Sequence, residues 1–466
     1  MTMKNINCHP YIPNSNIEVQ DEMLKEIGLN NLEQLHEEVP EEIRLKRKMN
    51  LPEPLVSEQD LKTHVEGILK KNSNCEKNIN FLGYGCYQHY VPAICDEINT
   101  RSEFLTAYGG EPYNDHGRFQ SLFEFESLIA ELVDMDVSNV PTFDWDQAAS
   151  TAIRMASRIT GRYEALVPKT MNMDRYKVMK NYCNPTVELV FVDYDEETGN
   201  LDLEDLKNKI TDKTCAVYIE NPSALGIIET QGMEISKIAH DHGAISIVGV
   251  DSISLGVLTP PGQYGADIVV GDVQCLGNHM NYGGGQCGYI ATHDEEKFVM
   301  EYPSRLFGIA PTTVKGEYGF GDVAYDRTSF GHLREQGKEY VGTQAALLGI
   351  TAAVYLSLMG PKGMREIGQT IMQKSQYASK KIGEIKGVKV NVFKSAFFKE
   401  FVVDFNDTGK TVEHINKKLL EKHIFGGKDL SKDYPELGES ALYCVTEIHT
   451  KEQIDTLVDA LKSILA

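Results

Sequence analysis

The sequence lacks a long apolar run, an excess of basic residues and a leader-like start. No apolar stretch in its 466 residues approaches the roughly 20 residues that a membrane-spanning helix needs. Lys and Arg number 46 against 68 Asp and Glu, and the net charge of -22 repels phosphate backbones and anionic lipid. Residues 1–5 lack the apolar core of a signal peptide. We therefore expect no nucleic-acid partner and no membrane.

Paired cysteines are also absent. The 9 cysteines are odd in number and scattered, with no Cys-x-x-Cys pair, which argues against a disulfide framework and against a zinc site. His240 and His242 are two residues apart, so they do not share a helix face as a pair of metal ligands would. We expect a protein of the reducing cytoplasm with no metal.

The most informative absence is that of lysine between Asp251 and Lys297. Residues 245–250 are a short β-branched run, typical of a strand buried on both faces, and they deliver Asp251 to the edge where open α/β sheets bind ligands. An Asp there can hold the pyridine nitrogen of pyridoxal phosphate, while a lysine one crossover later forms the Schiff base. A second strand follows at 266–270, but residues 271–280 contain no lysine. Only a primary amine forms the imine, so the pattern keeps the carboxylate and lacks the nucleophile.

Strand and helix patterns alternate through the middle of the chain. Strands are expected at 166–168, 189–192 and 215–219, with helices between them at 203–210 and 235–242. Strict alternation favours an α/β fold with a mostly parallel sheet and helices on both faces.

The two ends of the chain have other patterns. The first ~70 residues are short amphipathic pieces with little core of their own, which form either an arm on another subunit or domain or a surface decoration. An apolar helix at 345–358 precedes two strands and then helix, strand and helix, which indicates a small α+β sandwich. A chain of this length holds about two to three domains. We expect a helical arm at 1–75, a large α/β domain at 76–325 and a small α+β domain at 326–466.

Five segments match a known family in order and are spread along the chain: Tyr11–Asn14, Phe81–Pro92, Arg101–Tyr108, Pro260–Gly271 and Tyr434–Gly438. On these segments the chain resembles the α chain, or subunit 1, of the two-chain glycine dehydrogenase (decarboxylating). That enzyme is the P-protein of the glycine cleavage system. The resemblance extends over nearly the whole length and is far more specific than any short motif.

The resemblance implies an aminotransferase-like type I fold and an αβ or α2β2 assembly. In this family the β chain carries the lysine and the α chain does not. It therefore implies that this chain binds no cofactor covalently and that pyridoxal phosphate belongs to the lysine-bearing β chain (subunit 2). The pair would decarboxylate glycine and pass the aminomethyl group to a lipoyl carrier, the H-protein. This chain alone would be inactive.

Three segments depart from the family pattern. Residues 109–119 replace a Thr-Pro-Tyr-Gln-Pro-Glu-like loop, and residues 336–340 replace a Lys-Ala-Thr-Ser-Asn-like string. At a helix start, small residues that would offer N–H groups to a phosphate give way to Trp145 and Asp146. The tryptophan fills that space and the carboxylate repels a dianion, although an acidic residue there also complements the helix dipole.

No residue of this chain is expected to catalyse alone, and the candidates for a degenerate cofactor pocket or an interface are Asp251, Asn221, Trp145, Asp146, Tyr87, His89, His279 and Arg334. Several have a structural alternative. Asp251 either faces a ring or caps the turn after it, and Asn221 either faces the ring or forms a plain turn. Tyr87 and His89 either line the site or pack with satisfied polar groups. Arg334 either binds a carboxylate or pairs with a neighbouring glutamate.

Three functions remain open at this point. The first is the family's own, as the lysine-free subunit of a glycine dehydrogenase (decarboxylating). The second is a paralogous subunit that acts on a different amine or amino acid, suggested by the rewritten segments 109–119 and 336–340. The third is a non-catalytic stabilising partner whose site is closed by Trp145.

Overall fold

The computed structural model describes residues 11–12, 16–47, 49–105, 119–304, 306–323, 338–339 and 345–466. They fall into two units, Met1–Ser73 and Asn74–Ala466. The predicted boundary at 325/326 lies outside the described residues, and the predicted division at 75/76 stays a prediction.

The first unit contains short helices with exposed apolar side chains. Its two α-helices are α1 (Ile17–Glu26) and α2 (Glu58–Leu69), which begin after side-chain caps from Asn16 and Ser57. Among the described residues of this unit only Leu24 is buried. The unit therefore has no hydrophobic core in the part that the structure describes.

The second unit is built on a seven-stranded sheet of order β2-β8-β7-β6-β5-β3-β4. Strands β3 to β7 are parallel, whereas β8 and β2 are antiparallel to their neighbours. The strands are β2 (Val137–Ser138), β3 (Glu164–Pro168), β4 (Glu188–Val192), β5 (Thr214–Glu220), β6 (Ile245–Asp251), β7 (Ile268–Asp272) and β8 (Gly288–Thr292). The predicted mostly parallel α/β sheet is confirmed.

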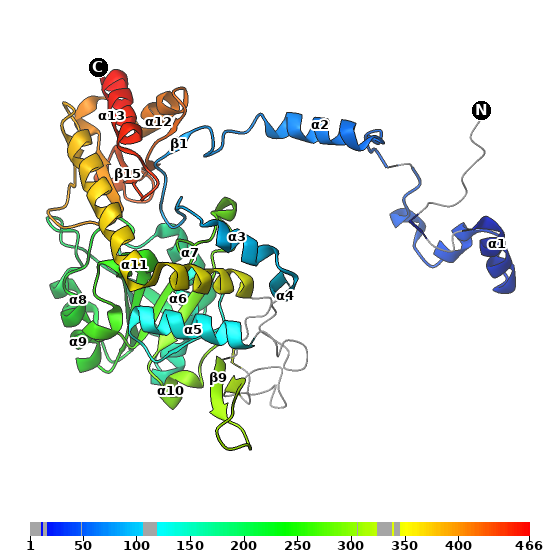
Figure 1. The fold of residues 1–466 in the computed structure, drawn as a ribbon, viewed down its shortest axis with the longest axis horizontal. Coiled ribbons are helices and arrows are strands. Elements are labelled where there is room, and N and C mark those ends of the chain that lie inside the picture. Colours follow the sequence, from blue (N-terminus) through cyan, green and yellow to red (C-terminus); the bar gives the residue numbers. More distant parts are fainter. Residues whose placement is uncertain are drawn as a thin grey trace. The chain divides into compact units, whose positions relative to one another are not determined.

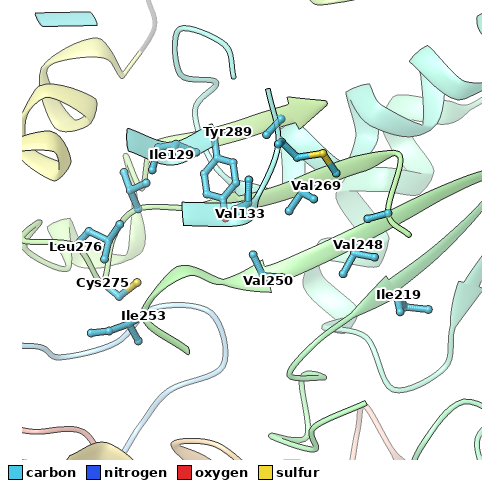
Figure 2. Packing of buried hydrophobic residues seen from close by; sticks show 14 of the residues in the cluster. Ile129, Val133, Ile219, Val248, Val250, Ile253, Val269, Cys275, Leu276 and Tyr289 are labelled. Atoms are coloured by element: carbon cyan, nitrogen blue, oxygen red, sulfur yellow. The ribbon is translucent and has the colours of Figure 1, made fainter. Parts of the chain in front are cut away.

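Alternate side chains of the central strands enter two different hydrophobic clusters. Val248, Val250 and Val269 pack on one face with Ile129 and Val133 of a covering helix, as Figure 2 shows. Neighbouring residues of the same strands face the other way, toward the helices of the opposite layer. Every residue of β5, β6 and β7 is buried, which explains their nearly continuous apolar sequence.

Helices cover both faces of this sheet. One cluster is lined by α5 (Phe119–Val133), α8 (Leu203–Lys209), α9 (Gly232–Asp241) and α11, and the other by α6 (Trp145–Thr160), α7 (Met173–Cys183) and α10 (Glu296–Val299). Helices α3 (Ala93–Thr100) and α4 (Ser102–Leu105) come before α5, and the hairpin of β9 (Leu306–Pro311) and β10 (Tyr318–Val323) follows α10.

A second sheet lies near the C-terminus, with its own hydrophobic cluster. Its order is β11-β12-β15-β14, and every pairing is antiparallel. Its elements are β11 (Lys389–Val390), β12 (Glu400–Asp404), α12 (Val412–Leu420), β14 (Lys428–Asp429), β15 (Ser440–Cys444) and α13 (Lys451–Leu465). The short strand β1 (Ile79–Asn80) pairs separately with β13 (Ile424–Phe425).

The long helix α11 (Ala346–Gly383) joins the two sheets and bends at Gly360, just before Pro361. In Figure 1 its first half runs beside α5, and its second half reaches the C-terminal sheet. By length and composition alone α11 could cross a membrane. Many of its apolar side chains, Ile350 and Ile371 among them, are instead buried inside the unit, whereas Leu358 is exposed.

The fragment 74–466 should fold without residues 1–73, because every hydrophobic cluster of the structure lies within it. We expect its melting temperature to lie within about 4 °C of that of the full chain, the upper end of the shift that about 1 kcal/mol produces in domains of about 150–250 residues. Thermal melts followed by circular dichroism test this. An unfolded or strongly destabilised fragment would show that the first unit completes the core.

Candidate functional site

Three buried carboxylates lie at one edge of the large sheet. The parallel strands β5, β6 and β7 end at Glu220, Asp251 and Asp272, and the register places Asp251 directly beside Asp272. All three residues are buried. Carboxylates in such a place need cations, hydrogen-bond donors or protons, because desolvation disfavours their charge.

Lys399, which directly precedes β12, supplies a cation to Asp251. Its side chain is 1% exposed, and its Nζ lies 2.6 Å from Asp251 Oδ2 and 3.2 Å from the centre of the Tyr87 ring. Nζ makes no hydrogen bond of ordinary geometry with the described residues, so the contact is an ion pair. Burial is the largest single influence and lowers the pKa of Lys399, but Asp251, together with the nearby Cys275, Cys444 and Glu400, outweighs it, so the pKa is raised. A protonated amine is no nucleophile.

Arg175, in the first turn of α7, supplies the second cation. Its Nη1 donates to Glu220 Oε1 at 2.5 Å, and its Nε donates to Asp146 Oδ1 at 3.0 Å. The guanidinium lies 3.8 Å from the centre of the Trp145 ring. The Trp145 indole N–H donates to the Tyr218 hydroxyl at 3.1 Å, and that hydroxyl donates to Glu220 at 3.0 Å. One buried network therefore joins the ends of α6, α7 and β5.

The start of α6 offers no open place for a phosphate. Asp144 caps the helix by accepting from the Gln147 backbone N–H at 2.8 Å. Trp145, the first helical residue, is 5% exposed and packs against Gly249 of β6. A Cβ at Gly249 would come within 2.7 Å of the indole, so glycine makes room for the tryptophan.

Glu400 and Asp272, whose carboxyl groups lie near Lys399, keep their protons up to an unusually high pH. Glu400 accepts from the Tyr84 backbone N–H at 2.6 Å and from the Tyr87 hydroxyl at 2.9 Å. Asp272 accepts from the Gln274 backbone N–H at 3.0 Å. Burial raises the pKa of both Glu400 and Asp272 to about 7.

The residues of this pocket do not fit pyridoxal phosphate. The cavity among them has a volume of about 20 Å³, room for about one water molecule, whereas pockets that take ligands of this size run to about 300–1,000 Å³. On the segment after β7, Gln274 binds the backbone of Tyr87 through Oε1 and Nε2, each at 2.9 Å, and no amine is presented. A ring would have to displace the ammonium from Asp251.

Four of the predicted residues come together here, namely Asp251, Trp145, Asp146 and Tyr87. Asp251 gives no capping hydrogen bond to the turn Ser252–Gly256, and its carboxylate pairs with Lys399. The predicted role of Asp251 toward a cofactor ring stays a prediction.

The other predicted residues lie elsewhere. The Asn221 side chain exchanges two hydrogen bonds of 3.1 Å with the Glu229 backbone, so it closes a loop. His89 pairs with Glu447 at 2.7 Å. Burial alone would raise the pKa of Glu447, but His89 and the Tyr90 backbone N–H together lower it to about 2. His279 pairs with Asp96 on the exposed surface, and Arg334 lies outside the described residues.

Four buried charged residues of the site were not found from the sequence: Lys399, Glu400, Arg175 and Glu220. The first two stand side by side within an aromatic run that includes Phe397, Phe398 and Phe401. Adjacent charges inside such a run are a usable signal, because a buried charge requires a partner.

Comparisons with known proteins agree with the resemblance. A family model described as "Glycine cleavage system P-protein" matches residues 9–461. "Probable glycine dehydrogenase (decarboxylating) subunit 1" of Staphylothermus marinus is 40% identical over 470 residues, with 99% of each chain covered. A protein of the same name from Thermococcus onnurineus is 38% identical, with 97% of this chain and 99% of the relative covered. The crystal structure of glycine decarboxylase (P-protein) of the glycine cleavage system, in inhibitor-bound form, superimposes with a TM-score of 0.84 at 31% identity, covering 98% of this chain and all of the other.

Replacing Trp145 by alanine should lower the free energy of unfolding by about 3–5 kcal/mol, because it leaves a large cavity and removes the support of Arg175. Phe143→Ala, at an aromatic residue 45% exposed two positions earlier, is the matched control and should cost far less. Urea unfolding followed by circular dichroism measures both. Equal losses would mean that Trp145 is not a packed element of the pocket.

Stability should fall as the pH rises from about 4 to about 7. Unfolded carboxyl groups titrate near pH 4, whereas folded Glu400 and Asp272 keep protons up to about 7, so the folded state binds more protons in this window. Each group contributes a slope of up to about 1.4 kcal/mol per pH unit. Glu400→Gln, which cannot ionise, should flatten the profile, while Glu413→Gln on the exposed surface should not. Parallel profiles for Glu400→Gln and the unaltered chain would contradict the assignment.

Proposed function

The chain belongs to the glycine cleavage system P-protein family, and on this premise we propose that it is subunit 1 of a two-chain glycine dehydrogenase (decarboxylating). The single observation that carries its role within the pair is the filled pocket. Where a cofactor ring would contact Asp251, the chain has placed its own Lys399. We assign to this subunit a structural role in the enzyme and no part in covalent catalysis.

The cofactor chemistry then belongs to the partner. We propose that pyridoxal phosphate binds a lysine-bearing subunit 2 and that a lipoyl carrier, the H-protein, receives the aminomethyl group there. The assembly is αβ or α2β2. All eight described cysteines are free thiols, which supports a reducing compartment such as the cytoplasm.

The first unit supports a role in binding another subunit. In α1, Val19 and Met23 are exposed, and in α2, Leu61, Val65 and Ile68 form an exposed stripe with helical spacing. An amphipathic helix gains most of its stability from burying such a stripe. We propose that these stripes are buried in the complex.

A paralogous subunit for a different amine or amino acid remains the alternative. The segments that suggested it, 109–119 and 336–340, lie largely outside the described residues. No contact among the described residues favours it over glycine.

Glycine-dependent incorporation of labelled bicarbonate should require this chain together with its partner. This chain alone should stay at background, because it presents no amine after β7 and its pocket is closed. Replacing the partner's cofactor lysine by alanine in the co-expressed complex is the control and should abolish exchange. A panel of larger amino acids tests the alternative substrate.

Exchange by this chain alone would contradict the proposed division of labour. A complex that prefers another amino acid over glycine would establish the paralogous function instead. A partner chain that is fully active by itself would leave this chain a stabilising role only.

A further inference from the structure

The C-terminal sheet and the large sheet meet at the closed pocket. Tyr87, Asp251, Lys399 and Glu400 form this junction, here named the seam. Asp251 belongs to the end of β6, whereas Lys399 and Glu400 stand at the start of β12. The ion pair between Lys399 and Asp251 therefore links the two sheets directly, from within the protein.

Backbone contacts hold the lysine segment on the loop after β5. The Phe398 N–H donates to the Gly226 carbonyl at 2.9 Å, and the Ile228 N–H donates to the Ala396 carbonyl at 3.0 Å. A Cβ at Gly226 would lie 2.0 Å from the Glu400 carbonyl oxygen, so this approach requires glycine. Lys399 itself has a φ of 61°, which lies in the left-handed region that residues other than glycine rarely adopt. A residue held in this conformation is fixed by its surroundings.

Tyr87 is held from both sides of the seam. Gln274, from the segment after β7, binds its backbone N–H and carbonyl, and Glu400 accepts its hydroxyl. The ammonium of Lys399 lies over its ring. The position of the tyrosine thus depends on groups from both sheets.

We infer that the seam is a closed internal lock, in which the Lys399 ammonium takes the place of a cofactor's positive ring on Asp251 and fastens the C-terminal sheet to the large sheet. A ligand ring could reach Asp251 only by expelling the buried ammonium from its ion pair. The lock therefore excludes a cofactor and at the same time fixes the relative position of the two sheets. It acts whichever substrate the complex uses, so it does not depend on the proposed function.

Hydrogen exchange of the full chain, read by mass spectrometry, tests the lock in the unaltered protein first. Peptides that contain residues 396–400 and 226–228 should exchange as slowly as the buried strands β5 and β6. Fast exchange there, against slow exchange in β5 and β6, would overturn the inference, because it would show a junction that opens freely.

Lys399→Met should then speed exchange in the same two segments by about tenfold or more, while β3 and β5 keep their rates. The matched control is Lys394→Met. Lys394 lies on the same segment and forms an ion pair of 2.5 Å with Glu197, on the side of the large sheet. The side chains of Lys394 and Glu197 are 76% and 65% exposed, so water screens this pair and it stabilises little. Unchanged exchange rates at the seam in Lys399→Met, or an equal increase in exchange rate throughout the unit, would overturn the lock.

The double variant Asp251→Asn with Lys399→Met separates charge pairing from simple packing. Each single change leaves one buried charge without its partner, whereas the double change leaves none. We expect the double variant to open the seam less than Asp251→Asn alone and more than the unaltered chain. Opening equal to the sum of the two single effects, or exchange identical to the unaltered chain, would show that the ion pair does not fasten the sheets.

Discussion

The buried ion pair between Lys399 and Asp251 is the interaction on which the candidate site depends. Three parallel strands end in carboxylates at one edge of the sheet, and such groups cannot stay charged in a dry interior without partners. Lys399 satisfies Asp251, and Arg175 satisfies Glu220. Asp272 is left with its proton up to a pH of about 7. The shape of the pocket follows from this distribution of charge. Pairing with the carboxylates holds the chain segments that carry Lys399 and Arg175 in the pocket.

Much of the fold could be predicted from the sequence, because buried parallel strands are recorded as nearly continuous apolar runs. Strands β5, β6 and β7 were each expected within a few residues of where they lie, and the missing amine after β7 was evident. Trp145 and Asp146 were singled out because a phosphate cradle tolerates neither. These features are local in sequence, where periodicity and residue type are informative.

The contents of the pocket could not be predicted, because they are brought together only by tertiary structure. The sequence around Lys399 gives no indication that Asp251 is its partner, because the two residues belong to different sheets. Asn221 follows its strand as predicted, yet its amide turns back to the Glu229 backbone. His279 stands on the segment that lacks lysine but points to Asp96 at the surface. The sequence positions of these residues thus indicated which edge of the sheet holds the site, but not the direction in which each side chain points.

Under the proposed division of labour, this chain has to replace both the volume and the charge that a cofactor would supply in this fold. An empty space of ligand size would destabilise the core by about 24 cal/mol for each Å³, and an unpaired Asp251 would add the cost of a buried charge. Here Trp145 fills the volume and Lys399 supplies the charge. Arg175 stacks on the Trp145 ring, and the Tyr87 ring lies against the Lys399 ammonium. The two replacements are far apart in the sequence and meet in one pocket. The proposed cofactor-free subunit is therefore held by contacts that a cofactor-binding chain could not have, since the cofactor would need the same positions.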